Sequence, residues 1–191
     1  MRIKTILDRS WRDEGRIPPA GLFLGGLIAQ SLISRHRGGV FSRLAGATIG
    51  LGSIALGVSA GTEFARRHTS LDPFVPDASE LVTTGANAVS RHPMYTGLVG
   101  LLVARAVARR SLVSLVPAAA VAYLIDTRQI PAEERVLAAR FGPAAETYRD
   151  TVPRWLDARS GPPLRALASD VETKVKGLMG QDESSPPPVP V

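Results

Sequence analysis

Two short motifs place polar and charged side chains in a pattern that could bind a charged cofactor. The first is the string RHPMYTG at residues 91–97, in which Pro93 suits the first position of a helix and His92 the residue before it. A helix start offers unpaired N–H groups and a partial positive charge, which favour a carboxylate. Tyr95 and Gly97 follow on the first turns. We expect the tyrosine to offer a ring and a hydroxyl, and the glycine to leave a gap for a ligand.

The second motif is acidic at its start. It comprises Glu133, Glu134, the FG pair at 141–142, Tyr148 and the VPRW string at 152–155. Acidic residues in the first turn of a helix stabilise it through the helix dipole, so the glutamates alone indicate a structural role. Two adjacent carboxylates can also pair with an ammonium group or with ribose hydroxyls. Combined with a carboxylate-binding helix start, they predict a site for an amino-acid-like, cationic cofactor.

Four apolar runs predict the helices that position these motifs. They cover residues 17–34, 44–62, 93–108 and 111–125. The first two contain no charged residue, and about 18 residues of helix span roughly 27 Å, close to the hydrocarbon core of a bilayer. The last two are shorter and are separated by Arg109 and Arg110, which predicts a helical hairpin. In a hairpin the start of the first helix and the end of the second lie on one side, so the two motifs must converge.

The same runs predict the fold class, which is an all-α, polytopic membrane helix bundle. We expect about four transmembrane helices, followed by short cytoplasmic C-terminal helices. Gly46 and Gly50, then Gly57 and Gly61, have the small-xxx-small spacing that lets helices pack closely in lipid. Arg105 lies one turn from the hairpin tip and can extend to the interface. The alternative is a soluble bundle with buried core helices, which two long uncharged runs disfavour.

Charge and composition predict the location of the protein. The formal net charge is +6, but the basic residues flank apolar runs and aromatic residues are scarce, so a juxtamembrane role explains them better than nucleic acid. The positive-inside rule places both termini and the second connection in the cytoplasm of a plasma (inner) membrane protein. Cysteine is absent, which excludes disulfides and thiolate metal sites.

A change of composition near residue 160 divides the chain into a membrane domain, residues 1–159, and a cytoplasmic tail, residues 160–191. The string GPP at 161–163 is typical of a linker. Apolar residues then recur at spacings of three and four, at Leu164, Leu167, Val171, Val175 and Leu178, which predicts one amphipathic helix. The end, residues 184–191, is Pro-rich and has the composition of a disordered segment.

The order and spacing of the two motifs around a hairpin resemble the isoprenylcysteine carboxyl methyltransferase and phospholipid methyltransferase superfamily, over about residues 81–156. The resemblance implies S-adenosylmethionine as cofactor, a membrane fold without a Rossmann domain, and a lipophilic or small methyl acceptor carrying a carboxylate, amine or thiol. Carried over by position, it implies a cofactor site made of His92, Tyr95, Gly97, Glu133, Glu134, Arg91 and Gly85.

The chain departs from the family pattern at two places. Asn87 stands where members often have an aromatic residue, and Ala145 stands where they have the first of two tyrosines. Both departures concern acceptor recognition more than cofactor binding. Methyl transfer from a sulfonium needs mainly positioning and desolvation. A carboxylate acceptor needs no general base, whereas for other acceptors His92 and Glu134 are the nearby candidates. No catalytic residue is assigned.

Two other functions compete with the enzyme hypothesis. One is a non-catalytic membrane protein of the same fold that serves as a partner or scaffold; retention of the RHP string and both glutamates favours catalysis. The other is a membrane metal or haem protein that uses His36, His68 and His92. These histidines fall in different connections and none is paired at ligand spacing, so we expect no metal site.

Overall fold

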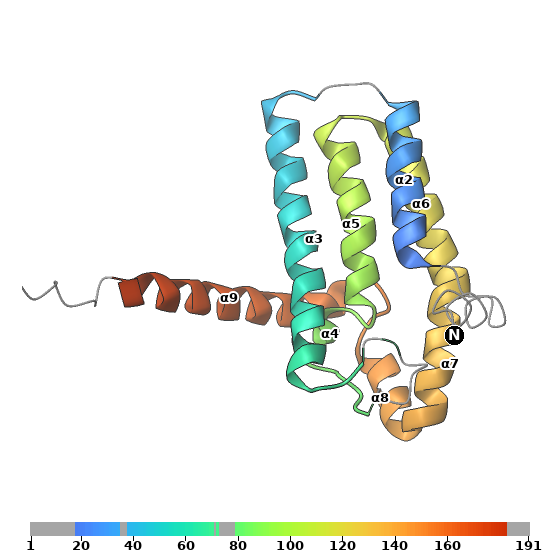
Figure 1. Ribbon diagram of the computed structural model, residues 1–191, viewed down its shortest axis with the longest axis vertical. Helices are drawn as coiled ribbons and strands as arrows, with labels where there is room; N and C mark the ends of the chain where they lie inside the picture. The colour runs from blue at the N-terminus through green and yellow to red at the C-terminus, as the bar shows by residue number, and fades with distance from the viewer. Residues whose placement is uncertain (1–17, 35–37, 71, 73–78, 183–191) are drawn as a thin grey trace, which may run out of the picture.

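The computed structural model describes residues 18–34, 38–70, 72 and 79–182. Within these ranges all regular structure is helical, which confirms the all-α prediction (Figure 1). The elements are α2 (Pro19–Ile33), α3 (Val40–Arg66), α4 (Ala86–Val89), α5 (Pro93–Ala108), η1 (Leu112–Ser114), α6 (Leu115–Leu124), η2 (Ile125–Gln129), α7 (Ile130–Phe141), α8 (Pro143–Thr151), η3 (Ala158–Ser160) and α9 (Gly161–Asp182). The basic N-terminal tail, His36 and the Pro-rich end at 184–191 lie outside the described residues.

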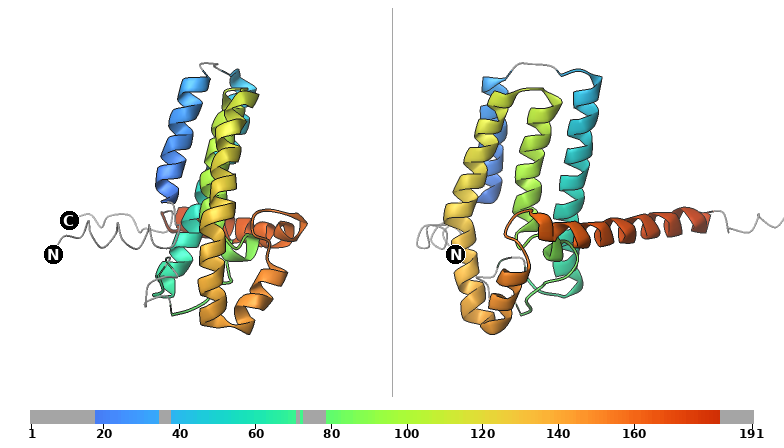
Figure 2. Two further views of the ribbon diagram at one scale, coloured as in Figure 1. Left: turned by 90° about the vertical axis from the view of Figure 1, so that its right-hand side faces the viewer. Right: turned by 180° about the vertical axis from the view of Figure 1, so that it is seen from behind.

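Helices α2, α3, α5 and α6 run side by side along the long axis of the molecule, and α7 and α8 continue beneath them (Figures 1 and 2). The predicted hairpin is present. Helix α5 begins at Pro93 with His92 as its N-cap and ends at Ala108, as the sequence predicted. The turn back to α6 contains Arg110 in a left-handed conformation, with φ 51°. Helix α9 extends sideways, crosswise to the bundle.

Close packing of α3 on α5 fixes the last turns of α5 within the bundle. A Cβ atom on Gly46 would lie 2.6 Å from the carbonyl oxygen of Ala104, so only glycine allows this approach. This observation supports the small-residue prediction for Gly46. For Gly57 and Gly61 a Cβ would meet nothing within 4 Å, so these positions do not serve helix packing within the chain.

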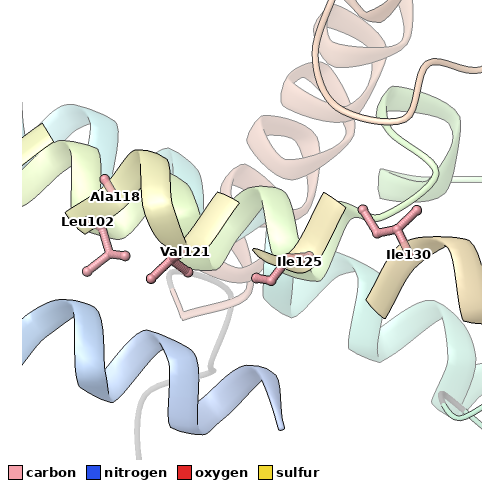
Figure 3. Close-up of a cluster of buried hydrophobic side chains, with 5 residues drawn as sticks. All are labelled: Leu102, Ala118, Val121, Ile125 and Ile130. Atoms are coloured by element: carbon pink, nitrogen blue, oxygen red, sulfur yellow. The ribbon is translucent and has the colours of Figure 1, made fainter. Parts of the chain in front are cut away.

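The apolar core lies between α5 and the continuous helix of α6, η2 and α7, beside α2 (Figure 3). Its buried members are Leu102, Ala118, Val121, Ile125 and Ile130. A polar side chain from α2 joins the same helices, because the buried Gln30 amide donates hydrogen bonds to the carbonyl oxygens of Leu102 and Ser114, both at 2.9 Å. Interhelical hydrogen bonds of this kind are typical of helices packed in lipid.

A single turn of π-helix, η2, joins α6 to α7 without a break. Pro131 explains it, because its ring lacks an N–H and crowds the carbonyl group four residues before it, which a wider turn accommodates. The glutamates lie near the beginning of α7, as the sequence predicted, but α7 continues directly from α6. Glu133 and Glu134 lie inside a continuous helix, and the π-turn decides which way each one points.

Two further predictions concern the linker at 161–163 and the number of membrane spans. The GPP string at 161–163 is not a linker but the first turn of α9, where proline is tolerated. Among the described helices, α3 is long and apolar enough to cross a membrane, whereas α2 and α5 are apolar but shorter. The number of membrane spans is therefore not established by helix length and composition alone.

Candidate functional site

A cavity of about 540 Å³ lies where α3, the first half of α5 and α7 meet. This volume falls within the range of small-molecule binding sites. Its apolar wall includes Ile54, Gly57 and Val58 of α3 and Leu98 and Leu101 of α5. Polar residues from the segment before α5, the start of α5, η2, α7 and α8 gather at one end of it: Asn87, Arg91, His92, Tyr95, Gln129, Glu133 and Tyr148; Ser53, Ser70, Asp72 and Glu80 also line the cavity. One cavity therefore combines a hydrophobic side with a compact polar end.

Glu133 is the centre of the polar end. Its Oε1 accepts hydrogen bonds from the Tyr95 hydroxyl at 2.5 Å and from Gln129 Nε2 at 2.7 Å. Its Oε2 lies 3.4 Å from His92 Nδ1. The His92 ring stacks on Tyr95, with ring centroids 5.8 Å apart. The start of α5 and the first turn of α7 thus meet through this carboxylate.

Three buried polar atoms of the residues that line this cavity have no hydrogen-bond partner among the described residues: Asn87 Nδ2, His92 Nε2 and Gln129 Oε1. A buried polar group without a partner costs about 1–3 kcal/mol, so native proteins keep few of them. Two are nitrogen atoms, and the third is an amide oxygen that can only accept. All three residues line the same cavity, whose polar end therefore offers both donors and acceptors to a ligand.

Glu134 faces the opposite side of α7 and does not line the cavity. Its Oε1 accepts from Arg91 Nη2 at 2.8 Å, and its Oε2 accepts from Arg154 Nη2 at 2.6 Å. His92 Nε2 lies 3.6 Å from Oε1, which is beyond hydrogen-bond distance. Both oxygens of this carboxylate are thus engaged by arginine.

Arg91 and its neighbours tie the C-terminal segment to the start of α5. The Arg91 guanidinium donates to the carbonyl oxygens of Arg149 and Val152, and its backbone N–H donates to Pro153 O at 2.8 Å. Trp155 Nε1 donates to Asp126 Oδ1 at 2.8 Å, which fixes the same segment to the π-turn. The VPRW string is therefore joined both to the start of α5 and to the π-turn.

These contacts shift the pKa values of His92 and Glu134. Burial by itself lowers the pKa of His92, but its interactions with Glu133 and Glu134 outweigh burial and hold the pKa above the ordinary value of 6.5. Burial raises the pKa of Glu134, yet the contacts with His92, Arg154 and Arg91 hold it well below its ordinary range. Glu134 is therefore ionised under all ordinary conditions.

Comparison with known proteins identifies the family. The phospholipid methyltransferase family matches residues 41–144, which is more than half of the chain. The chain belongs to this family. The match includes α3, the whole hairpin and both glutamates, and it confirms the superfamily inferred from the motifs. No curated protein and no solved structure gives a significant match.

The structure brings five of the seven predicted site residues of this methyltransferase-family chain to the cavity: Arg91, His92, Tyr95, Gly97 and Glu133. Glu134 and Gly85 do not line it. Gly85 adopts φ 60°, and a Cβ there would lie 2.9 Å from Glu63 Cγ, so this glycine serves a turn beside the end of α3. The gap expected at Gly97 is taken by α3, because a Cβ would lie 2.7 Å from Ser53 O.

Several cavity residues were missed as site candidates from the sequence, and two of them, Gln129 and Asn87, carry unpaired polar atoms. Gln129 lies four residues before Glu133, and that spacing puts both on one helix face, a signal that was present. Asn87 was noted only as a departure from the family pattern, yet its amide nitrogen is buried at the cavity and unpaired. Among the described residues no group of three or more side chains could hold a metal ion, and His36 lies outside them.

Proposed function

We propose that this chain is an integral membrane methyltransferase that uses S-adenosylmethionine and acts on a lipophilic or small acceptor carrying a carboxylate, amine or thiol. The observation that supports it best is one cavity, within the part of the chain that matches a methyltransferase family, lined by three residues that each carry a buried polar atom without a hydrogen-bond partner among the described residues. The non-catalytic alternative gives no reason to keep such atoms unpaired.

The donor set of the cavity fits the cofactor. S-adenosylmethionine supplies a methyl group already activated on a sulfonium, together with a carboxylate, an ammonium group and an adenosine. Asn87 of α4 and His92 offer side-chain nitrogen atoms suited to a carboxylate, and His92 stands at the N-terminal end of α5, where the helix dipole favours a negative charge. Glu133 and Gln129 offer oxygen atoms suited to an ammonium group or to ribose hydroxyls.

The bundle is proposed to span the membrane with α2, α3, α5 and α6. Large apolar side chains remain exposed along these helices and η1: Leu24, Ile28, Leu32, Ile33, Val40, Phe41, Leu44, Ile49, Leu51, Ile54, Val58, Leu112, Val113, Leu115, Val116 and Tyr123. Soluble monomers rarely expose a contiguous apolar surface of this extent. Helix α3, at 27 residues, is about 40 Å long and exceeds the hydrocarbon core. We place the site, and both termini, on the cytoplasmic side of the inner membrane.

The apolar wall of the cavity favours a lipophilic acceptor. Pro19 and Ala20, at the start of α2, complete this wall opposite α3. A charged cofactor would enter from the cytoplasm and an apolar acceptor from the bilayer, so that the two meet at the membrane interface. The reaction then depends on positioning and exclusion of water rather than on a covalent intermediate with the protein.

Of the two general-base candidates, the contacts favour His92. Glu134 is held ionised by two arginines and is a weak base, whereas His92 lines the cavity beside Tyr95 and Glu133. Because its pKa is raised, His92 accepts a proton only when the pH is above that pKa. An amine or thiol acceptor should therefore give activity that rises with pH, and a carboxylate acceptor should not.

Binding of S-adenosylhomocysteine to the full-length protein in detergent tests the site. Glu133→Gln keeps the shape and removes the charge, so it should weaken binding about ten- to hundredfold, the value of a charge-assisted contact of about 1.5–3 kcal/mol. Arg110→Ala, at the far tip of the hairpin, is the control and should bind like the wild type. If folded wild-type protein binds neither cofactor nor product, the methyltransferase proposal fails. If Glu133→Gln binds normally, the site is misplaced.

The acceptor class requires a separate assay. Native membranes that contain the protein would be incubated with methyl-labelled cofactor, and the label sorted into lipid, protein and volatile fractions. Label in the lipid fraction that depends on Glu133 supports a lipophilic acceptor. Cofactor binding without any transfer would favour the scaffold alternative.

A further inference from the structure

Helix α9 is only partly supported by the rest of the chain. It runs from Gly161 to Asp182 and packs at its beginning on α4 and η3, where Leu167 contacts the cluster of Leu56, Ala60, Ala86 and Val89. Beyond those first turns it projects sideways from the bundle (Figures 1 and 2). Helices in proteins are stabilised mainly by burial of an apolar face, yet the described side chains of this projecting part are exposed.

The projecting part carries such a face. Leu164, Leu167, Val171 and Val175 recur at spacings of three and four and so lie on one side of the helix. Leu164, Val171 and Val175 are 46%, 47% and 48% exposed. Ser169 and Thr173 lie on the opposite side of the helix. The α9 sequence has three basic and three acidic residues, so its net charge is balanced. Any partner must therefore be recognised by apolar contact rather than by charge.

The position of α9 indicates what that partner is. Leu167 anchors the helix beside Leu56 and Ala60 of α3, at the level where exposed apolar side chains of α3 end with Val58. The charged residues Glu63 and Arg66 begin one turn further on. A helix that leaves a membrane bundle at this level, and crosswise to it, lies in the plane of the membrane interface.

We propose that α9 is an interfacial helix whose Leu164–Val171–Val175 stripe binds the cytoplasmic surface of the bilayer. It would hold the C-terminal segment, and with it α4 and the base of the site, at a fixed depth. The link is direct, because Ser160 at the entrance to α9 donates a hydrogen bond to the carbonyl oxygen of Val89, two residues before Arg91. This inference depends on the proposed membrane placement of the bundle but not on cofactor binding.

Spin labelling of the full-length protein in phosphatidylcholine vesicles tests it, and the absence of cysteine gives a clean background. Val171→Cys and Val175→Cys report the apolar stripe, and Ser169→Cys and Thr173→Cys are the matched controls on the other face. Labels at 171 and 175 should be several-fold more accessible to oxygen than to a water-soluble nickel chelate, with the reverse at 169 and 173. Neutral lipid suffices because the helix charge is balanced.

Other results overturn the proposal in recognisable ways. Equal access of the nickel chelate to all four labels would show that α9 lies in water. Dipolar broadening between labels at 171 would show that a second copy covers the stripe. A label at Leu51→Cys, exposed on α3 and outside the cavity, reports the bundle itself. If that label is not in lipid, the membrane placement fails together with α9, whereas failed cofactor binding would leave every one of these readouts unchanged.

Discussion

The adjacent residues Glu133 and Glu134 lie on two different faces of α7 and have different hydrogen-bonding surroundings. On the cavity face, Glu133 accepts a hydrogen bond from Gln129, whose Oε1 has no hydrogen-bond partner among the described residues. On the other face, Glu134 is saturated by Arg91 and Arg154. The cavity face therefore has the incomplete hydrogen bonding of a ligand-binding site, and the Glu134 face has the complete hydrogen bonding of a structural contact.

The difference assigns separate roles to residues that look equivalent in the sequence. The Glu134 face holds the VPRW segment against the start of α5, because Arg91 also binds the carbonyl oxygens of Arg149 and Val152. These contacts of Glu134 and Arg91 fix His92, which lies between the two carboxylates. A stable frame on one side thus allows the other side to keep polar atoms unpaired, and substitutions on the two faces should have different consequences.

The largest expected effect comes from breaking the saturated face. Glu134→Gln leaves the Arg91 guanidinium, which is 10% exposed, without its counter-charge. Loss of one partner of a buried ion pair costs about 3–5 kcal/mol, and we expect the lower end because Arg154 is a third exposed and screened by water. Thermal unfolding in detergent measures it, with Glu133→Gln as the matched control. A Glu134→Gln protein as stable as wild type would remove the distinction between the faces.

The sequence predicted much of this arrangement and missed a definable part. Local signals were sufficient for the hairpin, because Pro93 marks the start of α5 and the arginine pair marks its turn. The predicted hairpin in turn required the two motifs to lie on the same side of the bundle. They could not show which glutamate faces the cavity, because that depends on the π-turn ahead of Pro131 and on distant arginines. Asn87 depends in the same way on folding of the loop before α5.

A pH titration tests the residue that joins the two faces. The folded pKa of His92 lies above 6.5, so the stabilisation from its contacts is fully present below about 6.5 and is lost as the pH rises through the folded pKa. Glu134 has a depressed pKa and acts in the opposite direction, with its contribution lost only in strong acid. The wild type should lose at most about 1.4 kcal/mol per pH unit on the alkaline side. His92→Gln should lack this slope, and an unchanged slope would assign it to another group.

The smallest effect concerns an atom that the folded chain leaves unpaired. Asn87→Leu keeps a similar shape and removes the buried Nδ2 that has no partner, while the backbone carbonyl of Asn87 still accepts from Tyr148. The variant should be as stable as wild type or more so, by up to about 1 kcal/mol, yet bind S-adenosylhomocysteine about three- to tenfold more weakly. Ser34→Ala is the control, because it removes an unpaired hydroxyl far from the cavity. It should not change binding. If Asn87→Leu binds S-adenosylhomocysteine as well as the wild type does, Asn87 contacts the acceptor rather than the cofactor. The variant should then have a raised KM for the acceptor.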